Sequence, residues 1–216
     1  MPEGAERARE RLPRHLDAMT KTKLADNQKR IDFFPTPSWC VHRLLEVVDL
    51  PGGFWLEPAV GDGAIVRAVN EVRDDVCWTK VDIRPECDAD LISDYTWCNC
   101  PSLDGLGPSK GQFDVIITNP PFSQAIDFVQ ASLVRSPIVA MLLRLNWLGS
   151  DKRSAFLRKT YPDVYVLPQR PSFDGRGTDF TEYAWFVWSN HGPRPGQYFI
   201  LSDTSLNDRK RKATLR

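Results

Sequence analysis

Four consecutive residues of this sequence, Asn119-Pro120-Pro121-Phe122, are of types that together could bind a flat, polar group. They follow a run of β-favouring residues, so they form a loop directly after a predicted buried strand. Two adjacent prolines remove two backbone donors and fix two φ angles, which stiffens the loop and leaves its carbonyls unpaired by neighbours. A rigid loop with carbonyls, an amide and an aromatic ring is suited to hold a planar polar ligand.

A second candidate site follows the first predicted strand, in the stretch LEPAVGDGA. Gly61 and Gly63 permit a tight turn and a close approach of the backbone to a ligand beside a helix. The dinucleotide fingerprint needs a third glycine where this chain has Val66, so the match to NAD binding, and to a dehydrogenase, is poor. Two glycines alone are also typical of an ordinary strand-to-helix turn.

Acidic side chains follow the next two predicted strands. Asp82 ends the second strand, about 20 residues after the glycines, where a carboxylate can accept two hydrogen bonds from a ribose diol. The alternative is that Asp82 caps the following turn. After the third strand, Asp94 and Tyr95 offer an acceptor and a ring for the amino group and the face of an adenine, and Asp90 is a competing acceptor.

The hydrophobic pattern predicts strands that alternate with helices and then two final strands without a helix between them. The predicted strands are 54–59, 77–83, 89–93, 113–118, 137–145, 163–168 and 182–188. We therefore expect an α/β fold with an open, mostly parallel, seven-stranded, doubly wound sheet of Rossmann-like type and a C-terminal antiparallel hairpin. Such sheets bind ligands at the carboxyl ends of their strands, where every polar motif above falls.

Composition excludes several classes of protein. The 216 residues are 42% hydrophobic and 26% charged, as in ordinary soluble globular proteins. No apolar run approaches the ~18 residues of a membrane span, and the charged start lacks a signal-peptide core. The five cysteines show no metal-binding spacing, so we interpret them as reduced thiols and expect no metal. These features predict an intracellular protein without a membrane partner, with the cytoplasm favoured and the nucleus as the alternative.

The net charge of zero conceals two basic ends. Residues 1–30 carry eight basic and five acidic side chains, and residues 202–216 carry five basic and two acidic ones. Basic ends on an acidic body suit a nucleic acid, because phosphate contacts supply affinity independent of sequence. The alternative is two solvated tails. We divide the chain into a basic arm (1–30), a catalytic domain (31–201) and a basic tail (202–216).

Taken in order, these motifs resemble a known family. FPTP before the first helix, LEPAVGDG, an acid ending strand two, an Asp-aromatic pair after strand three and NPPF after strand four occur in this sequence. They resemble the class I S-adenosylmethionine-dependent methyltransferases that methylate amino groups of nucleic acids. The order resembles the gamma arrangement of DNA adenine-N6 methyltransferases and covers about residues 33–188. NPPF with a glycine turn upstream is a strong signature.

The resemblance implies which residues bind S-adenosylmethionine and which bind the base. The cofactor residues come from FPTP, the glycine turn and the strand ends: Thr36, Pro37, Glu57, Pro58, Ala59, Gly61, Gly63, Asp82, Ile83, Asp94 and Tyr95. The catalytic residues are those of NPPF: Asn119, Pro120, Pro121 and Phe122. The Asn119 side-chain oxygen and the Pro120 carbonyl would hold both hydrogens of the target amine, and Phe122 would stack on the base.

The loop between the last two strands, 167–183, is the predicted substrate contact. Arg170 and Arg176 could bind phosphates and Phe173 could pack against the base, whereas the alternative is an ordinary long hairpin loop. Trp147 is a further candidate, although tryptophan is more often a core residue. Because a base inside a duplex cannot reach such a site, the substrate is single-stranded or the base is flipped out.

The chain departs from the gamma enzymes in one respect. Those enzymes usually carry a substantial target-recognition domain, but only 28 residues follow Trp188. We therefore expect low sequence specificity or recognition of nucleic-acid structure, or a protein partner that supplies target recognition. The leading hypothesis is a DNA adenine-N6 methyltransferase, with DNA favoured over RNA. The alternatives are methylation of an RNA adenine or guanine amine or of a protein glutamine, and a non-catalytic nucleic-acid-binding subunit that kept the fold.

Overall fold

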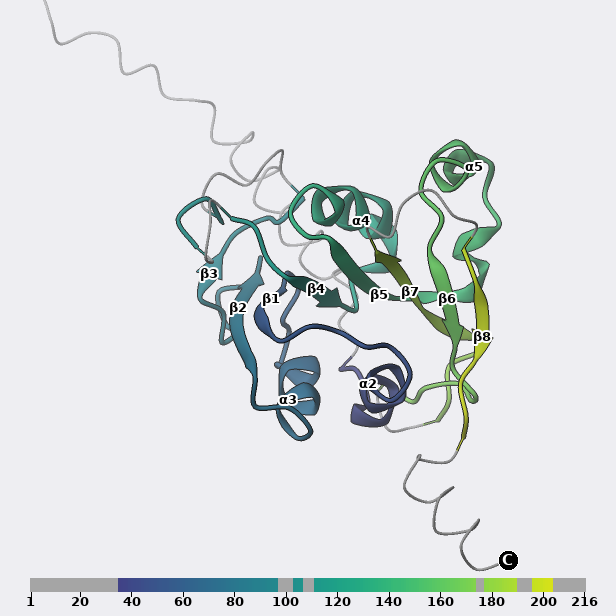
Figure 1. The fold of residues 1–216 in the computed structure, drawn as a ribbon, viewed down its shortest axis with the longest axis horizontal. Helices are drawn as coiled ribbons and strands as arrows, with labels where there is room; N and C mark the ends of the chain where they lie inside the picture. The colour runs from purple at the N-terminus through teal and green to yellow at the C-terminus, as the bar shows by residue number, and fades with distance from the viewer. Residues whose placement is uncertain (1–34, 97–102, 107–110, 174–176, 190–195, 204–216) are drawn as a thin grey trace, which may run out of the picture. The chain divides into compact units, whose positions relative to one another are not determined.

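The computed structural model describes residues 35–96, 103–106, 111–173, 177–189 and 196–203. All of them belong to the unit Phe33–Arg216. The predicted basic arm and the predicted tail beyond residue 203 lie outside the described residues. In the described part of the chain, one sheet carries helices on both of its faces (Figure 1). None of the described helices is long and apolar enough to cross a bilayer.

The strands of the sheet lie in the order β3-β2-β1-β4-β5-β7-β6-β8. Their bounds are β1 Gly53–Glu57, β2 Val76–Asp82, β3 Leu91–Ile92, β4 Val115–Thr118, β5 Ile138–Arg144, β6 Asp163–Val166, β7 Tyr183–Ser189 and β8 Tyr198–Ile200. β7 is antiparallel to both of its neighbours, β5 and β6, whereas all other neighbouring strands are parallel. The predicted open, mostly parallel sheet with an antiparallel hairpin of its sixth and seventh strands is confirmed.

The sheet contains one strand more than the seven that the sequence predicts. β8 is three residues long and pairs in parallel with β6 at the edge of the sheet. All three of its residues, Tyr198, Phe199 and Ile200, are exposed. A strand this short, with no alternation between buried and exposed positions, produces no recognisable hydrophobic pattern.

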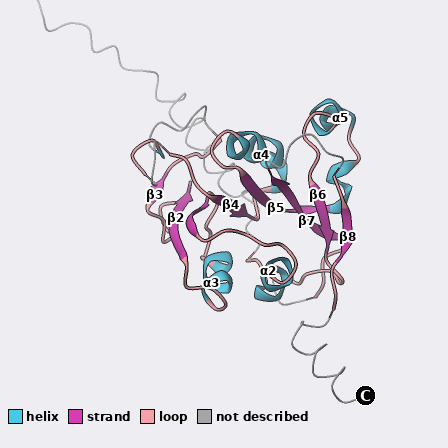
Figure 2. Cartoon of the chain, in the orientation of Figure 1, coloured by secondary structure: helices cyan, strands magenta, loops and turns pink. Residues whose placement is uncertain are grey.

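The helices form a layer on each face of the sheet, as Figure 2 shows. α2 (Ser38–Leu45) and α3 (Ala64–Asn70) lie on one face, and α4 (Ala125–Leu133) and α5 (Asp151–Leu157) lie on the other (Figure 1). β5 lies between the layers, and its successive side chains alternate between the two buried hydrophobic clusters of the core. Burial on both faces explains why the sequence of this strand is uniformly apolar.

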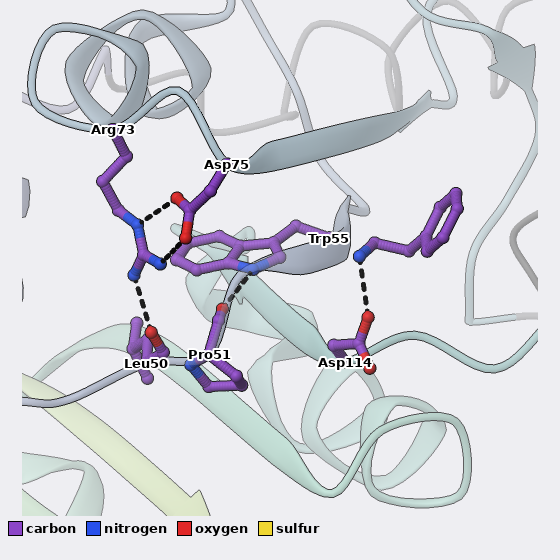
Figure 3. A network of polar contacts seen from close by, with 7 residues as sticks. Leu50, Pro51, Trp55, Arg73, Asp75 and Asp114 are labelled. Atoms are coloured by element: carbon purple, nitrogen blue, oxygen red, sulfur yellow. Dashed lines mark hydrogen bonds and ion pairs between the residues drawn. The ribbon is translucent and has the colours of Figure 1, made fainter.

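The amino ends of the strands are joined by a network of paired polar groups (Figure 3). The Arg73 guanidinium donates to both carboxylate oxygens of Asp75 and to the Leu50 carbonyl, at 2.6 to 2.9 Å. Its Cζ also lies 5.2 Å from the centroid of the Trp55 ring. The Trp55 indole donates to the Pro51 carbonyl at 2.9 Å. These contacts fix the start of β1 on the side of the sheet away from the predicted ligand edge.

Gly53, the first residue of β1, provides a test of this packing. Its φ is 110°, and a Cβ there would lie 2.4 Å from Asp114 Oδ2, which accepts the Phe54 N–H at 2.7 Å. We predict that Gly53→Ala lowers the free energy of unfolding by about 1–3 kcal/mol, because the backbone is strained and this hydrogen bond is displaced. Urea denaturation measures the change.

The matched control is Gly105→Ala. A Cβ at Gly105 would meet no atom within 4 Å, so its stability should change by no more than about 0.5 kcal/mol. Equal unfolding midpoints for the two variants would contradict the strain assigned to Gly53.

Candidate active site

The carboxyl ends of β1, β2 and β4 meet at one edge of the sheet, because these strands are neighbours and run parallel. Glu57 is the last residue of β1, Asp82 is the last residue of β2, and Asn119 directly follows β4. Open α/β sheets bind their ligands along this edge. The topology therefore brings together three of the residues that the sequence selects.

The glycine turn joins β1 to α3 and is fastened to the end of β2. Gly61 and Gly63 have φ values of 59° and 77°, a region that residues with a Cβ rarely adopt. The Val60 N–H donates to the Val81 carbonyl at 2.9 Å, and the Gly61 N–H donates to Asp82 Oδ2 at 2.8 Å. The two glycines are therefore needed to bend the chain back against β2.

Asp82 is 4% exposed and already accepts several hydrogen bonds. Its Oδ1 accepts from the backbone N and the Nε of Arg84, at 2.9 and 3.0 Å, and its Oδ2 accepts from Arg84 Nη2 at 3.2 Å and from Gly61 N. Burial raises the pKa of Asp82, but these hydrogen bonds outweigh it and lower the pKa below its ordinary value. The bond to Arg84 N is the turn cap considered as the alternative. A contact between Asp82 and a ribose stays a prediction. The ribose hydroxyls would bind a carboxylate that also accepts hydrogen bonds from Arg84.

Glu57 is a buried carboxyl group at the centre of this edge. It is 1% exposed, and neither carboxylate oxygen has a hydrogen-bond partner among the described residues. Burial raises the pKa of Glu57 well above its ordinary value, and the charge of Asp82 adds to the rise. The nearby Thr118 hydroxyl and Ala59 backbone lower the pKa in part, without making a hydrogen bond of normal geometry. Such an orphaned acid is costly unless a ligand binds it.

Asn119 is held by a residue from the other end of the domain. Its Nδ2 donates to Thr36 Oγ1 at 3.1 Å, and Thr36, two residues before the start of α2, is 5% exposed. With Nδ2 bonded to Thr36, the Asn119 Oδ1 atom is the other polar atom of this amide, and it is buried. Pro37, with a φ of −58°, is the N-cap residue of α2, so the predicted helix start is confirmed. Thr36 thus orients the Asn119 amide, a contact that the sequence did not predict.

The two prolines lead from β4 into a short 3₁₀ helix, η2 (Phe122–Gln124). Pro120 is buried, and Pro121 is the N-cap residue of η2 with φ −52° and ψ 122°. Phe122 is partly buried and packs against the core on the α2 side. Phe122 is therefore positioned as the first residue of η2 and by its packing against the core.

A cation and a tyrosine from the next strands contact Phe122. Arg144, the last residue of β5, places its Cζ 4.5 Å from the centroid of the Phe122 ring. The ring centroids of Tyr183 and Phe122 are 5.6 Å apart, and Arg144 Nε donates to the Tyr183 hydroxyl at 3.2 Å. Arg144 and Tyr183 are register partners in the β5–β7 ladder. The ladder thus positions both groups beside Phe122.

The predicted adenine-binding residues differ in exposure. Tyr95 is 3% exposed, and its hydroxyl is 2.9 Å from Ser132 Oγ in the core on the α4 side. Asp94 is exposed and accepts from Thr96, whereas the competing Asp90 accepts the Lys80 N–H at 2.7 Å, beside β2. Ile83, next to Asp82, is 50% exposed. Ile83 is therefore the accessible apolar side chain of this set.

The three predicted substrate residues that the structure describes, Arg170, Phe173 and Trp147, have different surroundings. Arg170 is exposed and forms an ion pair with Glu182, with 2.6 Å between Arg170 Nη2 and Glu182 Oε1. Phe173 is 8% exposed and packs edge-on against Tyr183, so it contributes to the core. Trp147, in η3 (Leu145–Leu148), is 6% exposed and packs edge-on against two aromatic rings of β7. Arg176 lies outside the described residues.

No family model and no curated protein matches the chain. Solved structures are similar to it. A protein assigned as the modification subunit of a type I restriction enzyme from Vibrio vulnificus YJ016 matches with a TM-score of 0.56 and 17% identity, over 89% of this chain and 52% of that one. An assigned RNA methyltransferase from Pyrococcus horikoshii matches with a TM-score of 0.54 and 14% identity, over 74% of this chain and 88% of that one.

An assigned O-methyltransferase from Agrobacterium tumefaciens matches with a TM-score of 0.55 and 14% identity, over 76% of this chain and 85% of that one. The chain has the class I methyltransferase fold. It spans about half the length of the Vibrio modification subunit. At these identities the likeness establishes the fold, and the chemistry must be argued from the residues of the site.

Three contacts of this methyltransferase fold were missed by sequence reasoning. Arg84 pairs with Asp82 from two positions along the chain, so the acid-x-arginine spacing was a usable signal. The contact of Thr36 with Asn119 and that of Arg144 with Phe122 join distant parts of the sequence and have no local signature. Among the described residues, no cluster of three or more potential ligands could hold a metal ion.

The buried carboxyl of Glu57 makes stability depend on pH. The folded-state pKa of Glu57 is raised. Its contribution to the free energy of unfolding is therefore complete below the ordinary carboxyl pKa and is lost as the pH rises through the raised pKa. We predict that Glu57→Gln, which cannot ionise, removes this decline. Urea denaturation of the cofactor-free protein at about pH 5 and about pH 8 measures it.

The control for this prediction is Glu86→Gln, since Glu86 is exposed. It should keep the wild-type difference between the two pH values. If the free energy of unfolding of Glu57→Gln fell with pH as steeply as that of the wild type, the raised pKa assigned to Glu57 would be contradicted.

Proposed function

We propose that this chain is an S-adenosylmethionine-dependent methyltransferase that methylates the N6 amine of adenine in DNA. The observation that carries the proposal is the position of the NPPF loop, residues 119–122. The loop follows β4 at the same edge where β1 and β2 end in Glu57 and Asp82. Amide and carbonyl acceptors thereby stand beside a buried carboxylate and a glycine turn, which is a suitable arrangement for an amine substrate and a charged cofactor.

The residues at this edge fit S-adenosylmethionine. Glu57 is a buried carboxyl group whose oxygens have no hydrogen-bond partner among the described residues, so it suits a ligand with hydrogen-bond donors and positive charge. Gly61 and Gly63 let backbone N–H groups approach a ligand closely. Asp82 and the exposed Ile83 would bind the ribose and the adenine, with Asp94 as the acceptor for the adenine amino group. When bound, the cofactor supplies a methyl group on a sulfonium, which is a good methyl donor because a neutral thioether is the leaving group.

The NPPF loop would activate the amine by holding it. The lone pair of an aromatic amine is delocalised into the ring, so the amine is a poor nucleophile. Asn119 Oδ1 and the Pro120 carbonyl can each accept one of its two hydrogens, which favours a pyramidal nitrogen with a directed lone pair. Proline rigidity keeps both acceptors in place, so positioning and electrostatics supply most of the catalysis.

The fold comparisons support two substrate polymers. The chain is similar in fold both to a restriction modification subunit, which favours DNA, and to an assigned RNA methyltransferase, which favours an RNA amine as the second candidate. Phe122, as a stacking surface, suits a base in either polymer. In a duplex, the base must first leave the stack. A protein partner that supplies target recognition is part of the proposal, and the likeness to a subunit of a larger enzyme supports it.

The test is methyl transfer from labelled S-adenosylmethionine to duplex DNA, single-stranded DNA, structured RNA and total protein in parallel, with nucleoside analysis of the product. We expect N6-methyladenine in DNA from the wild type and none from Asn119→Ala, because that variant loses one of the two amine acceptors. Label in RNA or in protein glutamine would overturn the DNA assignment and keep the chemistry. Cofactor binding without label in any substrate would indicate the non-catalytic subunit.

Thr36 gives a finer prediction. Its hydroxyl orients the Asn119 amide, so Thr36→Ala should lower kcat by about 10- to 100-fold, whereas Thr36→Ser, which keeps the hydroxyl, should stay near the wild type. Steady-state kinetics, with the polymer that the wild type methylates as substrate, separate the effects on kcat and KM. A Thr36→Ala variant that changes only the KM for the cofactor would mean that Thr36 contacts the cofactor and does not orient the amide.

A further inference from the structure

The loop between β6 and β7 presents a bare aromatic ring. The side chain of Phe180 is 96% exposed, the largest exposure among the large hydrophobic residues of the described chain. β6 runs parallel to β5, because both are antiparallel to β7. The loop after β6 therefore leaves the sheet at the same edge as the glycine turn and the NPPF loop.

The backbone that carries Phe180 is held at several points. The Asp179 N–H donates to the Pro171 carbonyl at 3.0 Å, and the Phe180 N–H donates to Asp179 Oδ1 at 2.5 Å. The Tyr183 hydroxyl donates to the other oxygen of Asp179. The backbone around Phe180 is therefore held in place, while the Phe180 side chain is exposed to solvent.

The same contacts connect the loop to the proposed base site. Tyr183, which holds Asp179, also contacts Phe122 and accepts a hydrogen bond from Arg144. The two acids that flank Phe180 are both engaged: Asp179 by Tyr183 and Glu182 by Arg170. Their engagement reduces the repulsion that free carboxylates would exert on phosphates near the ring.

We propose that Phe180 inserts into duplex DNA and stacks in the gap that the target base leaves when it is flipped toward Phe122. The inference rests on the proposed function, because it requires a base to leave the stack. Removing a base from a duplex costs stacking and pairing free energy. Apolar side chains inserted between base steps are a known way to offset this cost, and aromatic rings stack on any base.

The test compares the full-length wild type, Phe180→Ala and Phe180→Tyr in equilibrium binding to short DNA duplexes. One duplex is intact, and the other carries a single abasic residue, which provides the gap without the cost of flipping. We expect the wild type and Phe180→Tyr to bind the abasic duplex about tenfold more tightly than the intact one. Phe180→Ala should lose this preference, since it cannot stack.

A matched control is Tyr161→Ala. Tyr161 is also an exposed aromatic residue, at 54%, but it precedes β6 and so lies at the opposite edge of the sheet. It should keep the preference for the abasic duplex. Phe180→Ala should unfold at the wild-type urea concentration, because its ring is almost uncovered in the folded protein.

Several results would overturn the inference. They are an abasic preference that survives in Phe180→Ala, an equal loss of binding on both duplexes, or the same loss on single-stranded DNA or an RNA hairpin. Binding requires no methyl transfer, so failure of the proposed function is distinguishable. A wild type that methylates no DNA but shows a Phe180-dependent abasic preference would refute the activity and support the insertion.

Discussion

The parallel pairing of β1 with both β2 and β4 is the constraint on which the candidate site depends. It aligns three carboxyl ends, so that Glu57, Asp82 and Asn119 stand at one edge although they come from separate parts of the sequence. The hydrogen bond from Gly61 N to Asp82 then locks the glycine turn to β2. If any one of these pairings shifted by a residue, the side chains would turn to the opposite face and the site would be lost.

The two edges of the sheet differ in how their polar groups are satisfied. At the amino ends, Arg73 donates to the Asp75 carboxylate and to the Leu50 carbonyl, so these polar groups are paired within the described chain (Figure 3). At the carboxyl ends, the carboxylate of Glu57 is buried without a hydrogen-bond partner among the described residues. A folded protein tolerates such a cost chiefly where function requires it, and a cofactor that binds the carboxylate would remove it.

The antiparallel strand β7 extends the candidate site on the side of the proposed base-stacking residue Phe122. Its first residue, Tyr183, contacts Phe122, pairs with Arg144 and holds the loop that carries Phe180. One strand end thus connects the proposed base-stacking ring to a bare ring on the surface. The polar contacts of Tyr183 are made by a buried side chain, so they fix the loop more firmly than surface contacts would.

The sequence by itself determined the kind of sheet, the glycine turn and the NPPF loop, because hydrophobic period, glycine and proline act locally on the backbone. It also placed Asp82 and Asn119 at strand ends. Only the tertiary structure decided that Thr36 orients Asn119 and that Phe173 is buried while Phe180 is exposed. Two phenylalanines in one loop look alike in a sequence, and which of them is buried depends on the strands packed around the loop.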